Sequence, residues 1–151
     1  MPFDTNLVLC DGSVDWTYAS LVTSGYGVPT SATRNAGGFA VIDLLSTLGG
    51  PSQGLTVVLI LDDTSVADAD ELTLTIESCA AVTFASAVHE LTQLDLAAAT
   101  TGVILGSEAP CTIMRRVAPS HRYIRAKAVV TSGDDFKTGY IFLLPWGFNR
   151  L

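Results

Sequence analysis

Histidine, cysteine and carboxylate side chains could do chemistry in this chain, but they are few or scattered along it. The two histidines, His89 and His121, lie 32 residues apart. His89-Glu90 matches the start of the metalloprotease helix motif, yet the second histidine is missing and the neighbouring residues alternate as in a strand. Neither histidine has a neighbour in the sequence suited to acid–base chemistry. The sequence therefore predicts no catalytic residue and no enzyme activity.

The cysteines and acids do not form a metal motif either. Cys10, Cys79 and Cys111 are widely spaced, and an odd number of cysteines without a secretory signal favours buried, reduced thiols. Zinc binding needs clustered ligands. The acids between Asp62 and Glu71 lack the EF-hand spacing and predict a solvated loop. We expect no metal site and no cofactor.

Basic residues are concentrated near the end of the chain. Residues 1–114 carry a net charge of −12, whereas residues 115–151 carry +5. Either the folded domain has opposed charged faces, or its strands interleave and mix the charges in space. Five basic residues fall within thirteen positions: Arg115, Arg116, Arg122, Arg125 and Lys127.

These basic residues have three interpretations. Internal or inter-subunit salt bridges come first, because arginine pairs well with carboxylates. An acidic partner surface comes second. Nucleic acid comes last, because the rest of the chain is acidic and contains no nucleic-acid-binding motif. On a strand, Tyr123, Arg125 and Lys127 share one face, whereas Arg115 and Arg116 point to opposite faces.

Short alternating segments indicate an all-β fold. Leu72, Leu74 and Ile76 alternate with polar residues, and turn signals recur about every ten residues. We predict one domain over residues 1–151, a β-sandwich of jelly-roll or Greek-key type with about eight to ten short strands. No run approaches the ~18 apolar residues of a membrane helix. The start has no basic region typical of a signal peptide, so synthesis in the cytoplasm is expected.

Several segments of this domain have specific predictions. Residues 1–38 hold two opening strands, 6–10 and 14–22, separated by an Asp11-Gly12 turn and followed by a loop or arm. Residues 55–61 are apolar on both faces and predict a central strand, while residues 82–84 continue the sheet. The tail, residues 145–151, carries Trp146 and Phe148, which are typical of interface anchors.

The order of these segments resembles the small jelly-roll cement, or decoration, proteins of tailed-bacteriophage capsids. An Ile42-Asp43-Leu44 strand is followed by the apolar strand 55–61, an acidic turn and a Leu-Thr-Leu strand at residues 72–78. Gly106 and Pro110, an Arg-Tyr-Ile-Arg strand at 122–125 and a last strand from Gly139 follow. The similarity covers most of residues 40–144 and lies in the order of the motifs.

The resemblance implies a structural protein of the virion. Such a protein binds the exterior of the capsid, locks neighbouring major capsid subunits and forms homo-dimers or homo-trimers. Nucleic acid and membrane are not expected as partners. The predicted contact residues are Arg115, Arg116, Arg122, Tyr123, Arg125, Lys127, Trp146 and Phe148.

An alternative from another class is a carbohydrate-binding jelly-roll module of a phage fibre or surface protein. Trp16, Tyr18 and Trp146 would then serve as stacking platforms for sugar rings. A glycan array distinguishes this alternative from a cement protein.

Overall fold

The computed structural model describes residues 7–17, 41–44, 54–61, 71–85, 87–97, 111–130 and 135–145. Within these ranges the chain forms eight strands and no α-helix, so none is present there that could cross a membrane. The strands are β1 (Val8–Thr17), β2 (Val41–Asp43), β3 (Leu55–Leu61), β4 (Glu71–Cys79), β5 (His89–Ala97), β6 (Cys111–Val117), β7 (Tyr123–Val130) and β8 (Asp135–Pro145).

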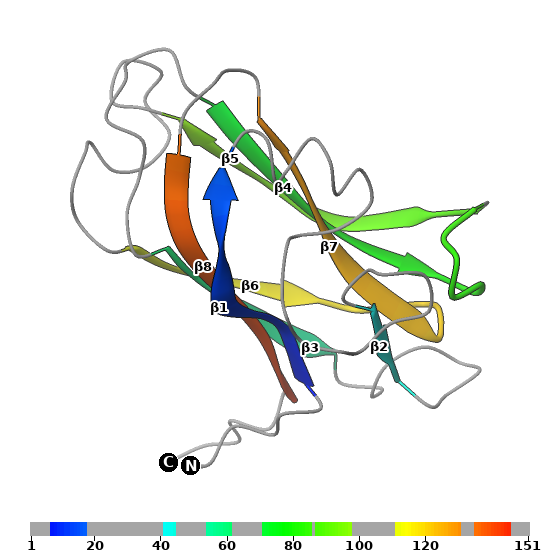
Figure 1. The fold of residues 1–151 in the computed structure, drawn as a ribbon. Helices are drawn as coiled ribbons and strands as arrows, with labels where there is room; N and C mark the ends of the chain where they lie inside the picture. Colours follow the sequence, from blue (N-terminus) through cyan, green and yellow to red (C-terminus); the bar gives the residue numbers. More distant parts are fainter. Residues whose placement is uncertain are drawn as a thin grey trace, which may run out of the picture.

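Two antiparallel sheets of four strands form the layers of the domain (Figure 1). The first sheet has the order β1-β8-β3-β6 and the second has the order β2-β7-β4-β5. The pairing is nested: β1 pairs with β8, β2 with β7, β3 with β6 and β4 with β5. Additional pairs β3–β8 and β4–β7 complete the two sheets. The predicted all-β sandwich is confirmed.

The main core lies between the two sheets and follows from the alternation of each strand. In β3, Leu55, Val57, Leu59 and Leu61 are all buried in one cluster. The second sheet contributes further buried residues to this cluster, among them Leu74, Ile76, Ile124 and Ala126. Because strand side chains alternate between faces, the residues between these positions point away from the core.

The predicted strand at residues 55–61 has the bounds of β3 and is central, as expected. The predicted turn at Asp11-Gly12 is wrong. β1 continues through it, with Gly12 at a φ of +69° and register shifts against β8 on either side. Glycine adopts this backbone without the steric penalty of a Cβ atom, so the chain bulges and does not reverse.

The prediction of a strand at residues 82–84 is also wrong, because these residues form part of the connection between β4 and β5. The Phe84 amide donates to the Ala81 carbonyl at 3.1 Å, and Phe84 has a φ of +51°. This turn lays Phe84 on the outer face of the second sheet, against Val41 and Cys79. A second, smaller apolar cluster therefore covers part of that sheet.

Candidate docking surface and histidine pair

The outer face of the first sheet carries one row of apolar residues that crosses all four strands, with Thr56, Thr112 and Asp11 in the neighbouring rows. Tyr140 on β8 pairs with Ile60 on β3. Two residues further along β8, Phe142 also faces outward and pairs with Val58. Val58 in turn pairs with Met114 on β6, and Phe142 pairs with Val8 on β1. A row of four apolar residues thus crosses all four strands. We call the residues of this surface the apolar face: Val8, Val58, Ile60, Met114, Tyr140, Phe142 and Leu144.

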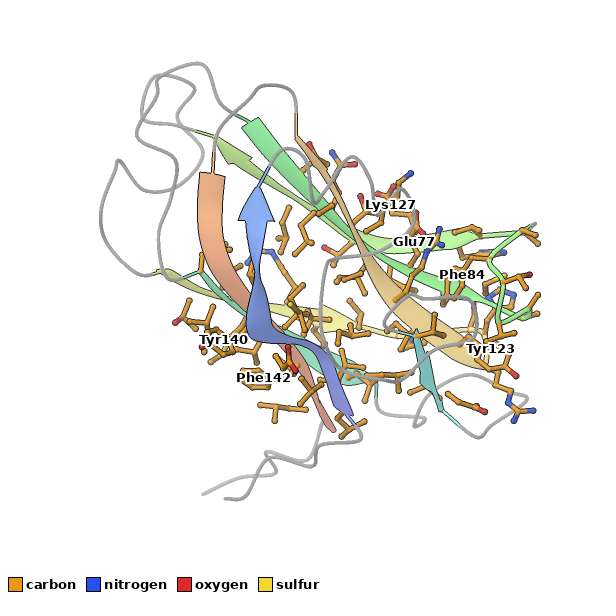
Figure 2. The ribbon with its side chains drawn as sticks, in the orientation of Figure 1. Glu77, Phe84, Tyr123, Lys127, Tyr140 and Phe142 are labelled. Atoms are coloured by element: carbon orange, nitrogen blue, oxygen red, sulfur yellow. The ribbon has the colours of Figure 1, made fainter. Side chains whose placement is uncertain are left out.

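Exposure divides the apolar face into a covered centre and open flanks. Val58 is only 2% exposed, although it points away from the main core and lies between Phe142 and Met114. Met114 is 59% exposed and Tyr140 is 42% exposed. Figure 2 shows Tyr140 and Phe142 along β8, on the side of the molecule opposite to Glu77, Phe84 and Lys127. Aromatic residues, methionine and arginine are enriched in the centres of protein interfaces.

The ring of Tyr140 lies directly over Gly12. A Cβ atom at Gly12 would be 2.3 Å from Cζ of Tyr140, which is closer than any real contact. An aromatic ring that covers a strand glycine shields the exposed backbone of that glycine. The bulge in β1 therefore positions the most exposed aromatic ring of the apolar face.

Arg115 and Arg116 flank this surface on the edge strand β6, and both are exposed. Arg116 lies on the outer face in the row after Met114. Arg115 has the register of the inward-facing Ile113, but it is exposed, and its guanidinium donates to the Met114 carbonyl at 3.0 Å. The register places the two arginines on opposite faces of β6, as predicted, and both residues are exposed.

Arg122 forms an ion pair within the chain. Its guanidinium donates from Nε and Nη2 to the two carboxylate oxygens of Asp43, each at 2.7 Å. The hydrogen bond and the negative charge of Asp43 raise the pKa of Arg122 above its ordinary value. The guanidinium also lies 5.2 Å from the ring centre of Tyr123. Because Arg122 and Asp43 are partly exposed, the pair contributes little stability by itself.

Arg125 is 4% exposed and pairs with the buried carboxylate of Glu77 at 2.7 Å. The ring of Phe84 covers the guanidinium, with its centre 4.2 Å from Cζ. Arg125 therefore belongs to the interior of the domain. Its side chain is not exposed in the way that the predicted role as a contact residue requires. Lys127 is half-buried on the outer face of the second sheet, two residues further along β7.

The two ion pairs bear on whether the acidic and basic parts of the chain form opposed faces or mix in space. Asp43 and Glu77 come from the acidic part of the chain, while Arg122 and Arg125 come from the basic part. Strand interleaving thus mixes these charges in space, as expected if the acidic and basic parts of the chain do not form opposed faces. Arg115 and Arg116 are exposed on β6, beside the apolar face.

Several predicted contact residues lie outside the described residues or side chains. Trp146 and Phe148 of the tail are outside, as are Tyr18 and the side chain of Trp16. Pro145 is the last residue of β8 and pairs with Leu55, so the tail beyond the strand starts at residue 146.

The structure brings together the two histidines, which sequence reasoning left apart. His89 opens β5 and His121 lies in the connection between β6 and β7. Their ring centres are 4.3 Å apart, with the ring planes tilted by 41°. Nδ1 of His121 lies 3.0 Å from the Ser120 hydroxyl and 3.5 Å from the buried Ser78 hydroxyl. Only the β4–β5 pairing, which sets His89 opposite Ser78, could have signalled this contact.

The expectation that the chain has no Gly-x-Ser-x-Gly pattern is wrong, because residues 50–54 read Gly50-Pro-Ser-Gln-Gly54. The nucleophile elbow of α/β-hydrolases requires a strand before the serine and a helix after it. Here Gly54 leads directly into strand β3. The pattern therefore lacks the structural context of a catalytic serine.

No family model matches the chain, and no curated protein or solved structure is significantly similar to it.

Proposed function

We propose that this chain is a jelly-roll cement protein of tailed-bacteriophage capsids, which binds the outside of the shell and locks neighbouring major capsid subunits. The protein acts by binding and not by catalysis. It is made in the cytoplasm of the host, and its partners are the major capsid protein and further copies of itself. The order of sequence motifs from residue 40 to residue 144 first suggested this role.

Strand pairing supports the jelly-roll part of the proposal. In a jelly roll, a long antiparallel hairpin is rolled up so that its outer and inner strand pairs enter two facing sheets. The nested pairs β1–β8, β2–β7, β3–β6 and β4–β5 are what such rolling produces. The additional pairs β3–β8 and β4–β7 are the contacts that close the roll.

The apolar face is the observation that most directly supports binding to the shell. A cement protein needs a broad contact surface that repeats over the shell, since many modest contacts add up through multivalency. The row from Val8 to Met114 crosses the whole first sheet, and Met114 and Tyr140 are well exposed. Arg115 and Arg116 add positive charge at the β6 side. The matching site on the capsid is an apolar patch bordered by carboxylates.

Co-sedimentation with shells that lack this protein tests the proposal. Met114→Glu places a charge on the apolar face, and we expect it to weaken shell binding by at least about tenfold, because a charge would be buried against an apolar patch of the shell. Met114 is exposed, so the sandwich should remain folded.

Val88→Glu is the matched control, because Val88 is another exposed large apolar residue but lies just before β5 in the second sheet. This variant should bind like the parent. Equal binding by Met114→Glu and the parent, with both proteins folded, would remove the apolar face from the proposal. Failure of the parent to bind any shell would overturn the function itself.

A further inference from the structure

The histidine pair lies at the end of the sandwich where two connections meet. His89 is exposed at the start of β5, after the β4–β5 connection, and His121 is half-buried in the β6–β7 connection. Their ring centres are 4.3 Å apart. Two imidazole rings from separate segments therefore approach each other at a surface position open to solvent.

The ring of His121 contacts two serine hydroxyl groups. The hydroxyl groups of Ser120 and Ser78 lie 3.0 Å and 3.5 Å from Nδ1 of His121. Ser78 is fully buried in β4, so this hydroxyl belongs to the interior of the second sheet. With Nδ1 occupied by hydroxyl groups, Nε2 is the nitrogen of His121 that remains for another ligand. Metal-bound histidines usually show this pattern, in which the second ring nitrogen donates to a neighbouring oxygen.

We propose, contrary to the expectation from the sequence, that His89 and His121 form a two-histidine binding site for a zinc-like divalent transition-metal ion. Neutral imidazole is a common ligand of such ions, and the His89 ring is exposed, so it is free to turn one of its nitrogens toward an ion bound by Nε2 of His121. The described residues contain no group of three or more histidine, cysteine or acidic side chains that could hold a metal ion. Water molecules would complete the coordination, so the site is open and weaker than a four-ligand structural zinc site.

The position of the site determines what binding would do. A metal ion held by both rings ties the start of β5 to the β6–β7 connection, which are brought together only in the folded chain. Binding therefore stabilises the native state by linkage, without being required for folding. This inference is independent of the capsid role.

Zinc titration followed by NMR of the imidazole signals tests the inference. The chain has only two histidines, so each signal can be assigned by substitution. We expect both imidazoles to shift together and to saturate at one equivalent of zinc, and we expect the melting temperature to rise with zinc concentration. His89→Ala and His121→Ala should each lower the zinc affinity at least about tenfold, since removal of even a supporting partner costs ~10–100-fold.

Cys111→Ser is the control for capture of zinc by a thiol, because Cys10 and Cys79 are buried. This variant should bind zinc like the parent. His89→Ala removes an exposed side chain, so its fold and its melting temperature without zinc should match the parent. Unshifted imidazole signals, parental zinc affinity in either histidine variant, or loss of zinc binding in Cys111→Ser would each overturn the site.

Discussion

The carboxylate of Glu77 and the guanidinium of Arg125 form a buried ion pair, 2.7 Å apart, on the outer face of the second sheet. The two residues are directly opposite each other in β4 and β7. Phe84 covers the pair, with its ring centre 4.2 Å from Cζ of Arg125. The pair therefore couples the β4–β5 connection to the centre of the sheet, and it holds Arg125 in the interior of the domain.

Removing one member of this pair should destabilise the fold strongly. Glu77→Leu leaves the Arg125 charge buried without the Glu77 carboxylate, and we expect a loss of ~3–5 kcal/mol in the free energy of unfolding. Urea denaturation of the variant and the parent measures this loss. Arg122→Leu is the comparison, because its pair with Asp43 is partly exposed and should cost much less.

Replacing both members of the buried pair should restore much of the stability. The double variant Glu77→Leu/Arg125→Met removes both charges and fills the site with apolar side chains of similar length. We expect it to be more stable than Glu77→Leu alone, because no buried charge is left without a partner. Additive losses in the double variant would show that the two residues act separately.

Two glycines with positive φ should differ in their response to alanine. Gly54 has a φ of +84°, and a Cβ there would lie 2.7 Å from the backbone carbonyl oxygen of Val117. Gly12 has a φ of +69°, but its added Cβ would meet the side chain of Tyr140, which can move. Each backbone costs an alanine ~1–2 kcal/mol. Thermal unfolding should therefore show a larger loss for Gly54→Ala, and the opposite order would contradict the described packing.

The buried thiols should react only after unfolding. Cys10 donates to the Gly139 carbonyl at 2.9 Å, and Cys79 lies in the small cluster under Phe84. Both are thiols and not members of a disulfide. Titration of the denatured, unreduced protein should find three thiols, and the native protein should show at least two fewer reactive groups on the same timescale. A single thiol after denaturation would indicate a disulfide.

Removal of the tail separates its two predicted roles. Deletion of residues 146–151 leaves Pro145 and the pairing of β8 with β3 intact. We expect the shortened protein to stay folded and to bind shells more weakly, since the aromatic anchors Trp146 and Phe148 are lost. Circular dichroism and co-sedimentation measure the two effects. An unfolded product would show that the tail is part of the fold, and parental binding would exclude it from the contact.

Strands could be predicted where the pattern of residues within the strand itself determines them. Residues 55–61 are apolar except for Thr56 and lie between Gly54 and Asp62, so both ends of β3 could be predicted. The shared outward face of Tyr123, Arg125 and Lys127 also follows from alternation alone. Gly12 was misinterpreted, because a glycine after aspartate is as typical of a hairpin turn as of a bulge, and only the pairing with β8 distinguishes them.

Features that depend on tertiary contacts could not be predicted in this way. The burial of Arg125 depends on Phe84, which residue patterns place in a strand but which lies in a strained turn. The contact of His89 with His121 depends on where the β6–β7 connection meets β5. The apolar face was partly visible, since residues 55–61 carry apolar side chains on both faces, but its width depends on the registers with β6 and β8.

Quantitative mass spectrometry of purified phage particles is the most direct test of the proposed capsid role. The particles to analyse are those produced by the genome that encodes this chain. A cement protein should be present in intact particles at a copy number comparable to that of the major capsid protein, because it repeats over the shell. Its absence from washed particles, or a copy number of only a few per particle, would contradict the proposal.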